Sequence, residues 1–277
     1  MKRTPTRRTM LAGLATGGLA SIAGCASMTP LVGQRIEDEE TIAVDGADRL
    51  SIHGDVGTVS AVGTDRDDIR LEAEKQSSSI TTDLDDLTLE TERTDERLEV
   101  RSEWEGSGGW FQNPPSMNLD ADVPRGVALE AIDMSVGRVA VRNVTGDLTV
   151  DTSTGRVDLA DVDGSVGVRT STGRVEIRDV DGIQGISTST GRVDTDVPAI
   201  DGDTTISTST GRIEAAVDPA IDAELHVSTS TGRIDVDDLE FAEVSEGSDL
   251  VTGTLGDGGP ELRFETGTGR ITLTTLE

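Results

Sequence analysis

The sequence predicts an all-β protein whose main part is a parallel β-helix, or β-solenoid, of short repeats. Its Gly-Arg pairs recur at intervals of 18, 18, 18, 20 and 21 residues between Gly137 and Gly232. Short apolar alternation fills the intervals, and a fixed period near 20 residues is typical of a stacked repeat array. Five of these pairs close identical copies of Thr-Ser-Thr-Gly-Arg, at 152–156, 170–174, 188–192, 208–212 and 229–233.

Residues 1–24 are predicted to be an export signal peptide. Lys2, Arg3, Arg7 and Arg8 form a basic start, and a weakly apolar stretch follows from Met10 to Gly24. That stretch is too short and too rich in small residues for a membrane span, which needs about 20 apolar residues. The Arg7-Arg8 pair resembles the twin-arginine export signal. We therefore expect the chain to be exported already folded.

The segment 25–45 is predicted to be a lipidated cysteine followed by an acidic tether. Ile22-Ala23-Gly24-Cys25 resembles a lipobox, the site at which a lipoprotein is lipidated and cleaved. Cys25 is the only cysteine, so intramolecular disulfides and Cys-based metal sites are excluded. A lipid on Cys25 would anchor the protein to the extracellular face of the membrane without spanning it. The run Glu37-Asp38-Glu39-Glu40 suggests a solvated linker to the folded part.

The charge of the chain excludes nucleic acid as a partner. The formal net charge is −29, and removal of the four cations of the signal takes the mature chain to −33. Only Lys2 and Lys75 are lysines, against 22 arginines. Acidic, lysine-poor chains with a twin-arginine signal resemble the secreted proteins of halophilic archaea. A dense carboxylate surface stays soluble at high salt, because salt screens its self-repulsion.

Residues 46–125 are predicted to form a less regular β region. Pairs such as Leu50/Ile52 and Leu98/Val100 alternate with polar residues at the period of two that a half-buried strand requires. Aromatic residues make up 2% of the chain, so we expect a thin aliphatic core. Three of these few aromatics lie around the Gly-rich break at 106–109, and they predict either a contact tip or a cap over the core: Trp104, Trp110 and Phe111.

Residues 126–277 are predicted to be the β-repeat solenoid. In the coil 165–182, Val166, Val168 and Thr170 point to one side, and Val175 resumes that side after the Gly173 turn. A single coil has too few aliphatic side chains to fold alone, so neighbouring coils must stack. An elongated antiparallel β-sandwich is the alternative, since a Thr-Gly turn also suits a hairpin. The strand order and handedness of the stack stay open.

If the coils stack, the repeats create three columns. The inward threonines form a hydroxyl column whose members are expected to bond one another or nearby backbone: Thr152, Thr170, Thr188, Thr208 and Thr229. Outward arginines form a second: Arg156, Arg174, Arg192, Arg212 and Arg233. Acids two residues on form the third: Asp158, Glu176, Asp194, Glu214 and Asp235. We expect a structural ion-pair network from the last two, and binding of acidic glycans by the arginines is the alternative.

The sequence predicts no catalytic residue, no cofactor and no metal. His53 and His226 are far apart in sequence and lack metal-ligand spacing, and no hydrolase or phosphate-loop motif is present. The Asp-Val-Asp-Gly segments at 161–164 and 179–182 are explained by turn chemistry, with calcium binding left open.

The order of these features resembles the family known as putative adhesin, a domain of unknown function in bacterial and archaeal envelope proteins. The resemblance covers roughly residues 43–277. It rests on the turn-Gly-polar-aliphatic repeats, on Val123-Pro124-Arg125-Gly126 before the array, and on Gly256 to Leu262 followed by Gly269-Arg270-Ile271-Thr272-Leu273. Arg follows the turn Gly in every full copy here, where the family commonly has an acid.

These expectations combine into one functional hypothesis. The chain is predicted to be a non-enzymatic, lipid-anchored structural or adhesin-like module of the envelope, which binds a surface polymer or another protein. A carbohydrate-active β-solenoid enzyme acting on surface polysaccharide is the first alternative. An envelope sensor that acts through a protein partner is the second. A lateral cleft with paired carboxylates would favour the enzyme, and a uniform ladder would favour the scaffold.

Overall fold

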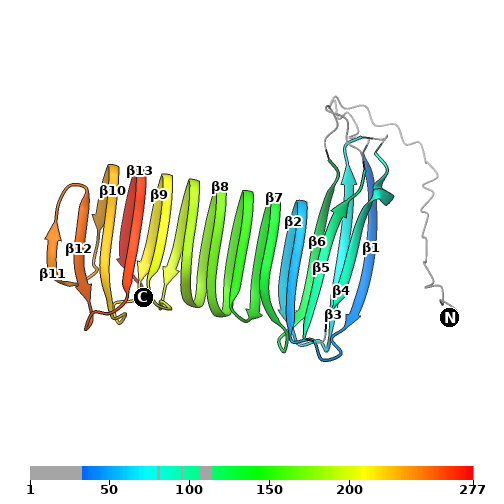
Figure 1. Cartoon of the computed structure of the whole chain (residues 1–277), viewed down its shortest axis with the longest axis horizontal. Coiled ribbons are helices and arrows are strands. Elements are labelled where there is room, and N and C mark those ends of the chain that lie inside the picture. The colour runs from blue at the N-terminus through cyan, green and yellow to red at the C-terminus, as the bar shows by residue number, and fades with distance from the viewer. Residues whose placement is uncertain (1–32, 80–81, 95, 107–113, 277) are drawn as a thin grey trace, which may run out of the picture. The chain divides into compact units, whose positions relative to one another are not determined.

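The computed structural model describes residues 33–79, 82–94, 96–106 and 114–276, and in them the predicted all-β class is confirmed (Figure 1). One short 3-10 helix, Leu84–Asp86, accompanies the strands. Within the described residues, no helix is long and apolar enough to cross a membrane. The strands are β1 (Gln34–Ala43), β2 (Arg49–Thr64), β3 (Asp68–Ser77), β4 (Leu87–Arg93), β5 (Arg97–Trp104), β6 (Ser116–Pro124), β7 (Ala128–Thr145), β8 (Leu148–Val197), β9 (Thr204–Val217), β10 (Ala223–Val236), β11 (Ala242–Glu246), β12 (Leu250–Leu255) and β13 (Glu261–Thr275).

The repeats pair in parallel and form one stack. The strand order is β1-β3-β6-β2-β7-β8-β9-β13-β10-β12-β11, and β8 alone winds through 50 residues of successive coils. From β2 to β10 the stacked neighbours are parallel. Antiparallel pairing is confined to the two ends, where β1, β3, β6, β4 and β5 cover the first coil and β12 and β11 cover the last.

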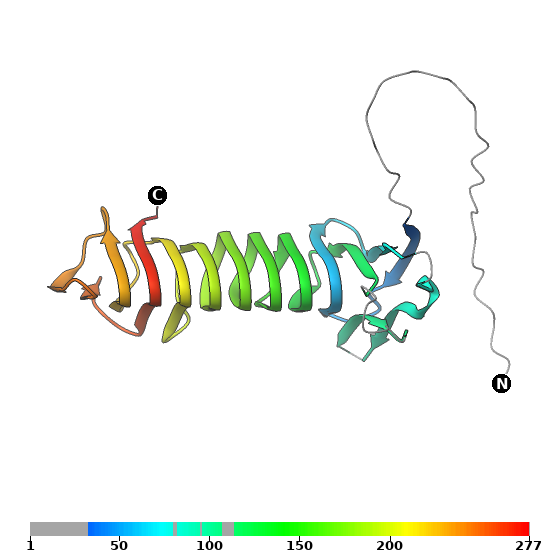
Figure 2. The same cartoon turned by 90° about the horizontal axis from the view of Figure 1, so that it is seen from above.

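The last strand does not lie at the end of the stack. β13 inserts between β9 and β10 and is parallel to both, as Figures 1 and 2 show from two directions. Gly269 is in register with Gly211 on one side and with Gly232 on the other. The fourth and fifth copies of the repeat are therefore neighbours in sequence but are separated in space by the C-terminal strand.

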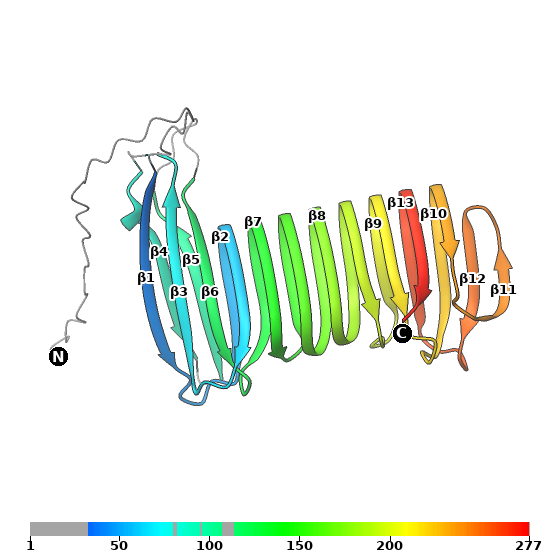
Figure 3. The same cartoon turned by 180° about the vertical axis from the view of Figure 1, so that it is seen from behind.

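Each coil bends at its Ser-Thr-Gly mark and so contributes to two faces of the stack. In β2, residues 49–53 pair with β5, whereas residues 57–64 pair with β6. We call the side formed by the first halves of the coils the β5 face, and the side formed by the second halves the β6 face (Figure 3). A thin aliphatic core lies between them, in which Leu50, Ile52, Val157 and Val175 are fully buried. Phe264 of β13 is the largest fully buried side chain.

The turn glycines stack with their backbones in direct contact. A Cβ atom on Gly173 would lie 1.8 Å from the carbonyl oxygen of Gly155, and one on Gly191 would lie 1.8 Å from that of Gly173. The same contact runs through the rest of the column, from Gly57 through Gly137 to Gly211, Gly269 and Gly232. No other residue fits such a contact, so the glycine of each repeat is required by the distance between coils.

The buried threonine column differs from the prediction in its hydrogen bonds. Thr152, Thr170, Thr188, Thr208 and Thr229 are buried as expected of inward residues, and Thr266 of β13 joins them. Their hydroxyls, however, have no hydrogen-bond partner within the described residues. Identical side chains in register lie about one strand spacing apart, roughly 4.8 Å, whereas a hydroxyl bond needs about 2.8 Å. The threonines therefore contribute packing of their methyl groups instead of a hydroxyl chain.

The acidic run expected in the tether belongs instead to a strand. Residues 34–43 form β1, which pairs with β3. Cations of β3 offset its charge, because Arg70 Nε lies 2.8 Å from Glu39 and Lys75 Nζ lies 3.0 Å from Asp38. The hydrogen bond from Arg70, then its charge, lowers the pKa of Glu39 below the ordinary value. A strongly charged edge strand also discourages edge-to-edge association.

The backbone conformation of the Asp-Val-Asp-Gly turns explains why they begin with Asp. Asp161 and Asp179 take φ values of +54° and +51°, and Asn143 takes +58° at the equivalent place in β7. Asn and Asp tolerate this left-handed region better than other side-chain-bearing residues. The first Asp of each turn is thus explained by the conformation that reverses the chain.

Replacing Gly173 by Ala tests the glycine column. The added methyl overlaps the Gly155 carbonyl, so the coils must separate, and we expect the free energy of unfolding to fall by about 3 kcal/mol or more, the upper range of overpacking. Chemical denaturation measures it. Gly126→Ala is the matched control, because nothing lies within 4 Å of its Cβ. Equal stability of the two variants would contradict the close-contact column.

Cysteine pairs test the insertion of β13, in a Cys25→Ser background. Thr231 and Thr268 are exposed, in-register neighbours, so the pair Thr231→Cys with Thr268→Cys has Cα atoms within disulfide range. We expect it to cross-link on mild oxidation. The pair Thr210→Cys with Thr231→Cys is two strand spacings apart, about 9.6 Å, and should not. Cross-linking of the second pair but not the first would show that the copies stack in sequence order.

Candidate functional site

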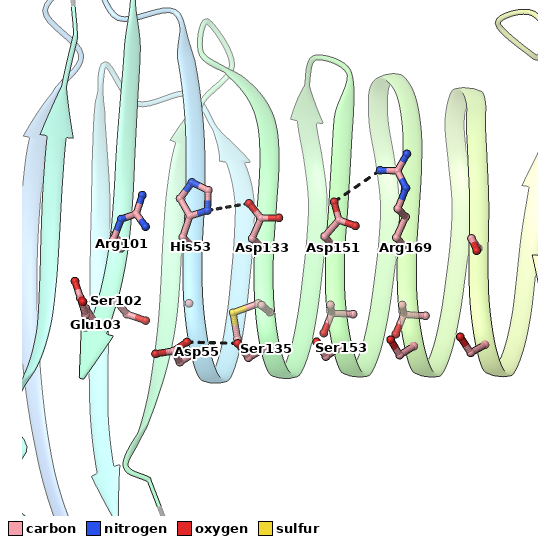
Figure 4. A pocket seen from close by; sticks show the side chains of 17 residues that line it. His53, Asp55, Arg101, Ser102, Glu103, Asp133, Ser135, Asp151, Ser153 and Arg169 are labelled. Atoms are coloured by element: carbon pink, nitrogen blue, oxygen red, sulfur yellow. Dashed lines mark hydrogen bonds and ion pairs between the residues drawn. The ribbon is translucent and has the colours of Figure 1, made fainter. Parts of the chain in front are cut away.

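A polar groove lies on the β5 face, across β5, β2, β7 and the first coils of β8. Its volume is about 690 Å³. Two rows of side chains line it, and each row takes one residue from each successive strand (Figure 4). We call it the lateral groove. Its residues are the outward ones of strands whose alternate side chains fill the core, as the alternation of a β-strand requires.

The upper row of the lateral groove is charged. Its charged members on β2, β7 and β8 are His53, Asp133, Asp151 and Arg169, with Arg101 on β5 in register with His53, and the neutral Ser187 ends the row on the next coil. His53 Nδ1 lies 2.8 Å from Asp133 Oδ2, and its Nε2 lies 3.4 Å from Glu99 Oε1. Arg169 Nη1 lies 3.8 Å from Asp151 Oδ2. Figure 4 shows these side chains side by side along the stack.

The lower row of the groove carries hydroxyl groups. It consists of Ser135, Ser153, Ser171 and Ser189, the serines that precede the turn in successive coils, and Asp55 continues it onto β2. Ser135 Oγ lies 3.4 Å from Asp55 Oδ1. The central serine of the repeated Thr-Ser-Thr-Gly-Arg motif therefore forms part of this surface.

The lateral groove presents a set of hydrogen-bonding side chains. Both ring nitrogens of His53 face carboxylates, so neither is directed at a serine hydroxyl. Among the residues that the structure describes, no group of three His, Cys, Asp or Glu side chains is arranged to hold a metal ion. The described lining offers guanidinium donors, carboxylate acceptors and a repeated serine hydroxyl, and no aromatic ring.

The structure places the predicted arginine and acid columns beside each other on the β6 face. Arg156 lies 2.5 Å from Asp158 on its own strand and 3.1 Å from Glu176 on the next coil. Arg174 repeats this arrangement, 3.3 Å from Glu176 and 3.8 Å from Asp194. Each acid is thus shared between two arginines, which makes a continuous network in the first half of the array.

The pairing becomes sparse in the second half. Arg212 lies 3.1 Å from Glu214, and Arg270 of β13 lies 3.8 Å from Asp235. Among the described residues, Arg192 and Arg233 have neither an ion pair nor a hydrogen bond from their side chains. The predicted columns are therefore in place along the whole stack but are ion-paired throughout only in its first half.

A part-buried cluster closes the paired half of the network. Arg178 Nη2 lies 2.5 Å from Asp194, and its Nη1 lies 3.4 Å from Asp196. Burial raises the pKa of Asp196 above its ordinary value, and the charge of Arg178 opposes that rise. Burial alone would lower the pKa of Arg178, but the hydrogen bond and charge of Asp194 outweigh it and the pKa rises.

The remaining predicted site residues divide into two groups. Trp104 packs partly buried against the core at the end of β5, which fits a cap better than a free contact tip. Arg7, Arg8, Cys25, Trp110 and Phe111 lie outside the described residues.

Sequence reasoning missed the charged row of the lateral groove. His53 is noticed in the sequence only as a poor metal ligand, and Asp133, Asp151 and Arg169 are not singled out at all. One signal could have found them. They occupy the position directly before the inward Thr or Met (before Gly54 on β2). This position changes from coil to coil, whereas the Thr-Ser-Thr-Gly-Arg that follows it in the full copies is constant.

Fold and site together define a stacked β-repeat protein with a polar groove along its side. No family model and no curated protein matches the chain. Among solved structures it is similar to a putative cell adhesion protein from Clostridium sporogenes, with 13% identity, a TM-score of 0.37, and coverage of 88% of this chain and 100% of that one.

Two further solved structures are similar over comparable lengths. A putative adhesin from Bacteroides fragilis has 11% identity and a TM-score of 0.32, with 88% of this chain and 97% of that one covered. A putative lipid binding protein from Parabacteroides distasonis has 9% identity and a TM-score of 0.36, with 87% and 97% covered. At these TM-scores the likeness carries no argument, so the function proposed below rests on the chain's own residues.

Replacing Arg178 by Gln tests the part-buried cluster. At neutral pH we expect the free energy of unfolding to fall by about 1 kcal/mol, a value discounted because the guanidinium is 36% exposed. A carboxyl whose pKa is raised by folding stabilises the folded state when the pH is below the pKa of the unfolded state. This contribution is lost as the pH rises through the pKa of the folded state. Without Arg178 the pKa of Asp196 rises further, so the deficit should shrink as the pH falls towards 3.8, the ordinary value for Asp.

Urea denaturation at pH 7 and pH 4 measures this dependence. Arg142→Gln is the control, because Arg142 is exposed and has no ion pair among the described residues. A deficit that grows as the pH falls would contradict the assignment.

Proposed function

We propose that this chain is a non-enzymatic module of the cell surface, and that its lateral groove binds a glycan of the envelope. In this proposal the twin-arginine signal exports the folded chain, and a lipid on Cys25 holds it at the extracellular face of the membrane. The single observation that supports the binding role is the lateral groove itself, to which successive strands along the stack add polar side chains.

The ligand class follows from the geometry of the rows. Neighbouring strands lie about 4.8 Å apart, so a chain-like ligand lying along the stack meets a new pair of polar side chains at each strand. The rows offer both hydrogen-bond donors and acceptors. Sugar hydroxyls can accept hydrogen bonds from the donors and donate hydrogen bonds to the acceptors. The side chains are also accessible: Arg169 is 72% exposed and Asp133 is 47% exposed. A polyhydroxylated polymer satisfies such a surface better than an apolar ligand does.

One observation favours a second candidate, a carbohydrate-active enzyme. Asp133 and Asp151 are in register on neighbouring strands, which brings two carboxylates to about one strand spacing, close to the roughly 5–5.5 Å of retaining glycosidases. A general acid of that chemistry needs an apolar environment that keeps it protonated. Asp133 and Asp151 are instead 47% and 42% exposed, and they face His53 and Arg169. We therefore place binding first.

Substitution of Asp133 and Arg169 tests the proposed function. We expect the full chain to bind envelope polysaccharide prepared from the producing organism, and Asp133→Asn with Arg169→Gln to weaken binding about tenfold, as loss of a charged hydrogen bond predicts. Arg142→Gln on the opposite face is the matched control and should bind as the unaltered chain does. Titration calorimetry measures affinity, and an assay for new reducing ends detects cleavage.

Three results would contradict the proposal. The first is equal binding by the groove variant and the control. The second is release of reducing ends that is lost in the groove variant, which would establish the enzyme instead. The third concerns the anchor, because Cys25→Ser is expected to shift the protein from the membrane fraction to the medium, and unchanged membrane retention would exclude lipidation at Cys25.

A further inference from the structure

A second groove lies on the β6 face, where the glycine column leaves the surface without side chains. Its floor is the backbone of Gly191, Gly211, Gly269 and Gly232, and the arginine after each glycine forms its wall. Its volume is about 660 Å³. We call it the arginine groove. In space its arginines follow the order Arg192, Arg212, Arg270, Arg233 on β8, β9, β13 and β10.

The inserted strand β13 has no acid at the position that carries one on the neighbouring strands. The residue two positions after the arginine is Asp194 on β8, Glu214 on β9 and Asp235 on β10, but on β13 it is Thr272. Arg270 consequently reaches across to Asp235 at 3.8 Å, and the described part of the chain leaves Arg233 without an ion pair.

Arg192, at the other end of the groove, has no ion pair in the described structure for a different reason. Asp194 on its own strand is already contacted by Arg174 at 3.8 Å and by Arg178 at 2.5 Å. Glu214 on the next strand is contacted by Arg212 at 3.1 Å. Of the four arginines of the groove, the first and the last are therefore the ones whose guanidinium groups are exposed and have no partner in the described structure.

We propose that the arginine groove binds a linear anionic polysaccharide, whose oxyanions pair with Arg192 and Arg233. A guanidinium group presents a planar fork of donors that matches a carboxylate or sulfate. Arg192 and Arg233 are separated by three strand spacings, roughly 14 Å. A small anion cannot reach both, whereas a polymer lying along the glycine floor can.

A polysaccharide fits better than a nucleic acid. The net charge of −29 opposes any polyanion outside the local cationic strip of the arginine groove, and it opposes one with a charge on every backbone unit, such as a polyphosphate, more than one with widely spaced charges. The described lining of the groove also has no aromatic ring on which bases could stack. The arginine groove shares no lining residue with the lateral groove, so the two sites are separate.

The test compares two double variants that remove the same charge from the same column. In Arg192→Gln with Arg233→Gln, both arginines lack partners, so the variant keeps its pairing network. In Arg156→Gln with Arg174→Gln, both arginines belong to the paired half. The full chain and both variants are titrated with dextran sulfate, alginate, neutral dextran and single-stranded DNA, and their melting is followed by circular dichroism.

We expect the full chain to bind dextran sulfate or alginate, in a manner that salt weakens, and not neutral dextran. The polymer that binds identifies sulfate or carboxylate as the preferred group. Loss of Arg192 and Arg233 should lower the affinity about tenfold or more, and loss of Arg156 and Arg174 by about threefold at most. No binding of either polyanion, equal losses in the two variants, or tighter binding of DNA would each overturn the proposal.

Discussion

The contact between turn glycines is the constraint on which the rest of the structure depends. From Gly57 to Gly232, each glycine lies so close to the carbonyl oxygen of its neighbour that a Cβ would overlap it. This contact fixes the distance between coils and the register of every residue on either side. With the register fixed, the threonine three residues before the glycine of each full copy is buried, and the arginine that follows the glycine faces outward. Identical repeats are thus a consequence of one backbone distance that only glycine allows.

The same constraint explains how a strand from the C-terminus fits between two coils. β13 carries Thr266, Gly269, Arg270 and Ile271 at the spacing of the repeats, so it satisfies the register of β9 and β10 without the full motif. Phe264 fills the core there with the largest fully buried side chain of the chain. The order of stacking is therefore decided by which segments present glycine, aliphatic residues and threonine in phase, and not by their order in the sequence.

The sequence is sufficient to predict which side chains of a coil are buried, but it is insufficient to predict which coils are neighbours in the stack. Alternation within the copies predicts which of Val157, Thr170 and Arg174 are buried, because that depends on the local period alone. Strand order depends on contacts between residues far apart in sequence, and periodicity has no information on these. The acidic run of β1 misleads for a related reason, since its partners Arg70 and Lys75 lie on a strand 30 or more residues away. The lateral groove is not predicted because a repeat is recognised by its constant positions. His53, Asp133, Asp151 and Arg169 occupy the variable position.

Constant and variable positions serve different purposes in such a stack. The constant residues make every coil equivalent, so any outward residue is held at a fixed distance from its counterpart on the next strand. Changing one outward residue per coil can then produce a defined row of side chains, such as the row from His53 to Arg169 on the β5 face. On the β6 face the change is smaller still. Thr272 stands where neighbouring strands carry an acid, so Arg270 contacts Asp235 and Arg233 is left without an ion pair in the described structure. The regularity of the array is what gives these isolated differences a defined geometry.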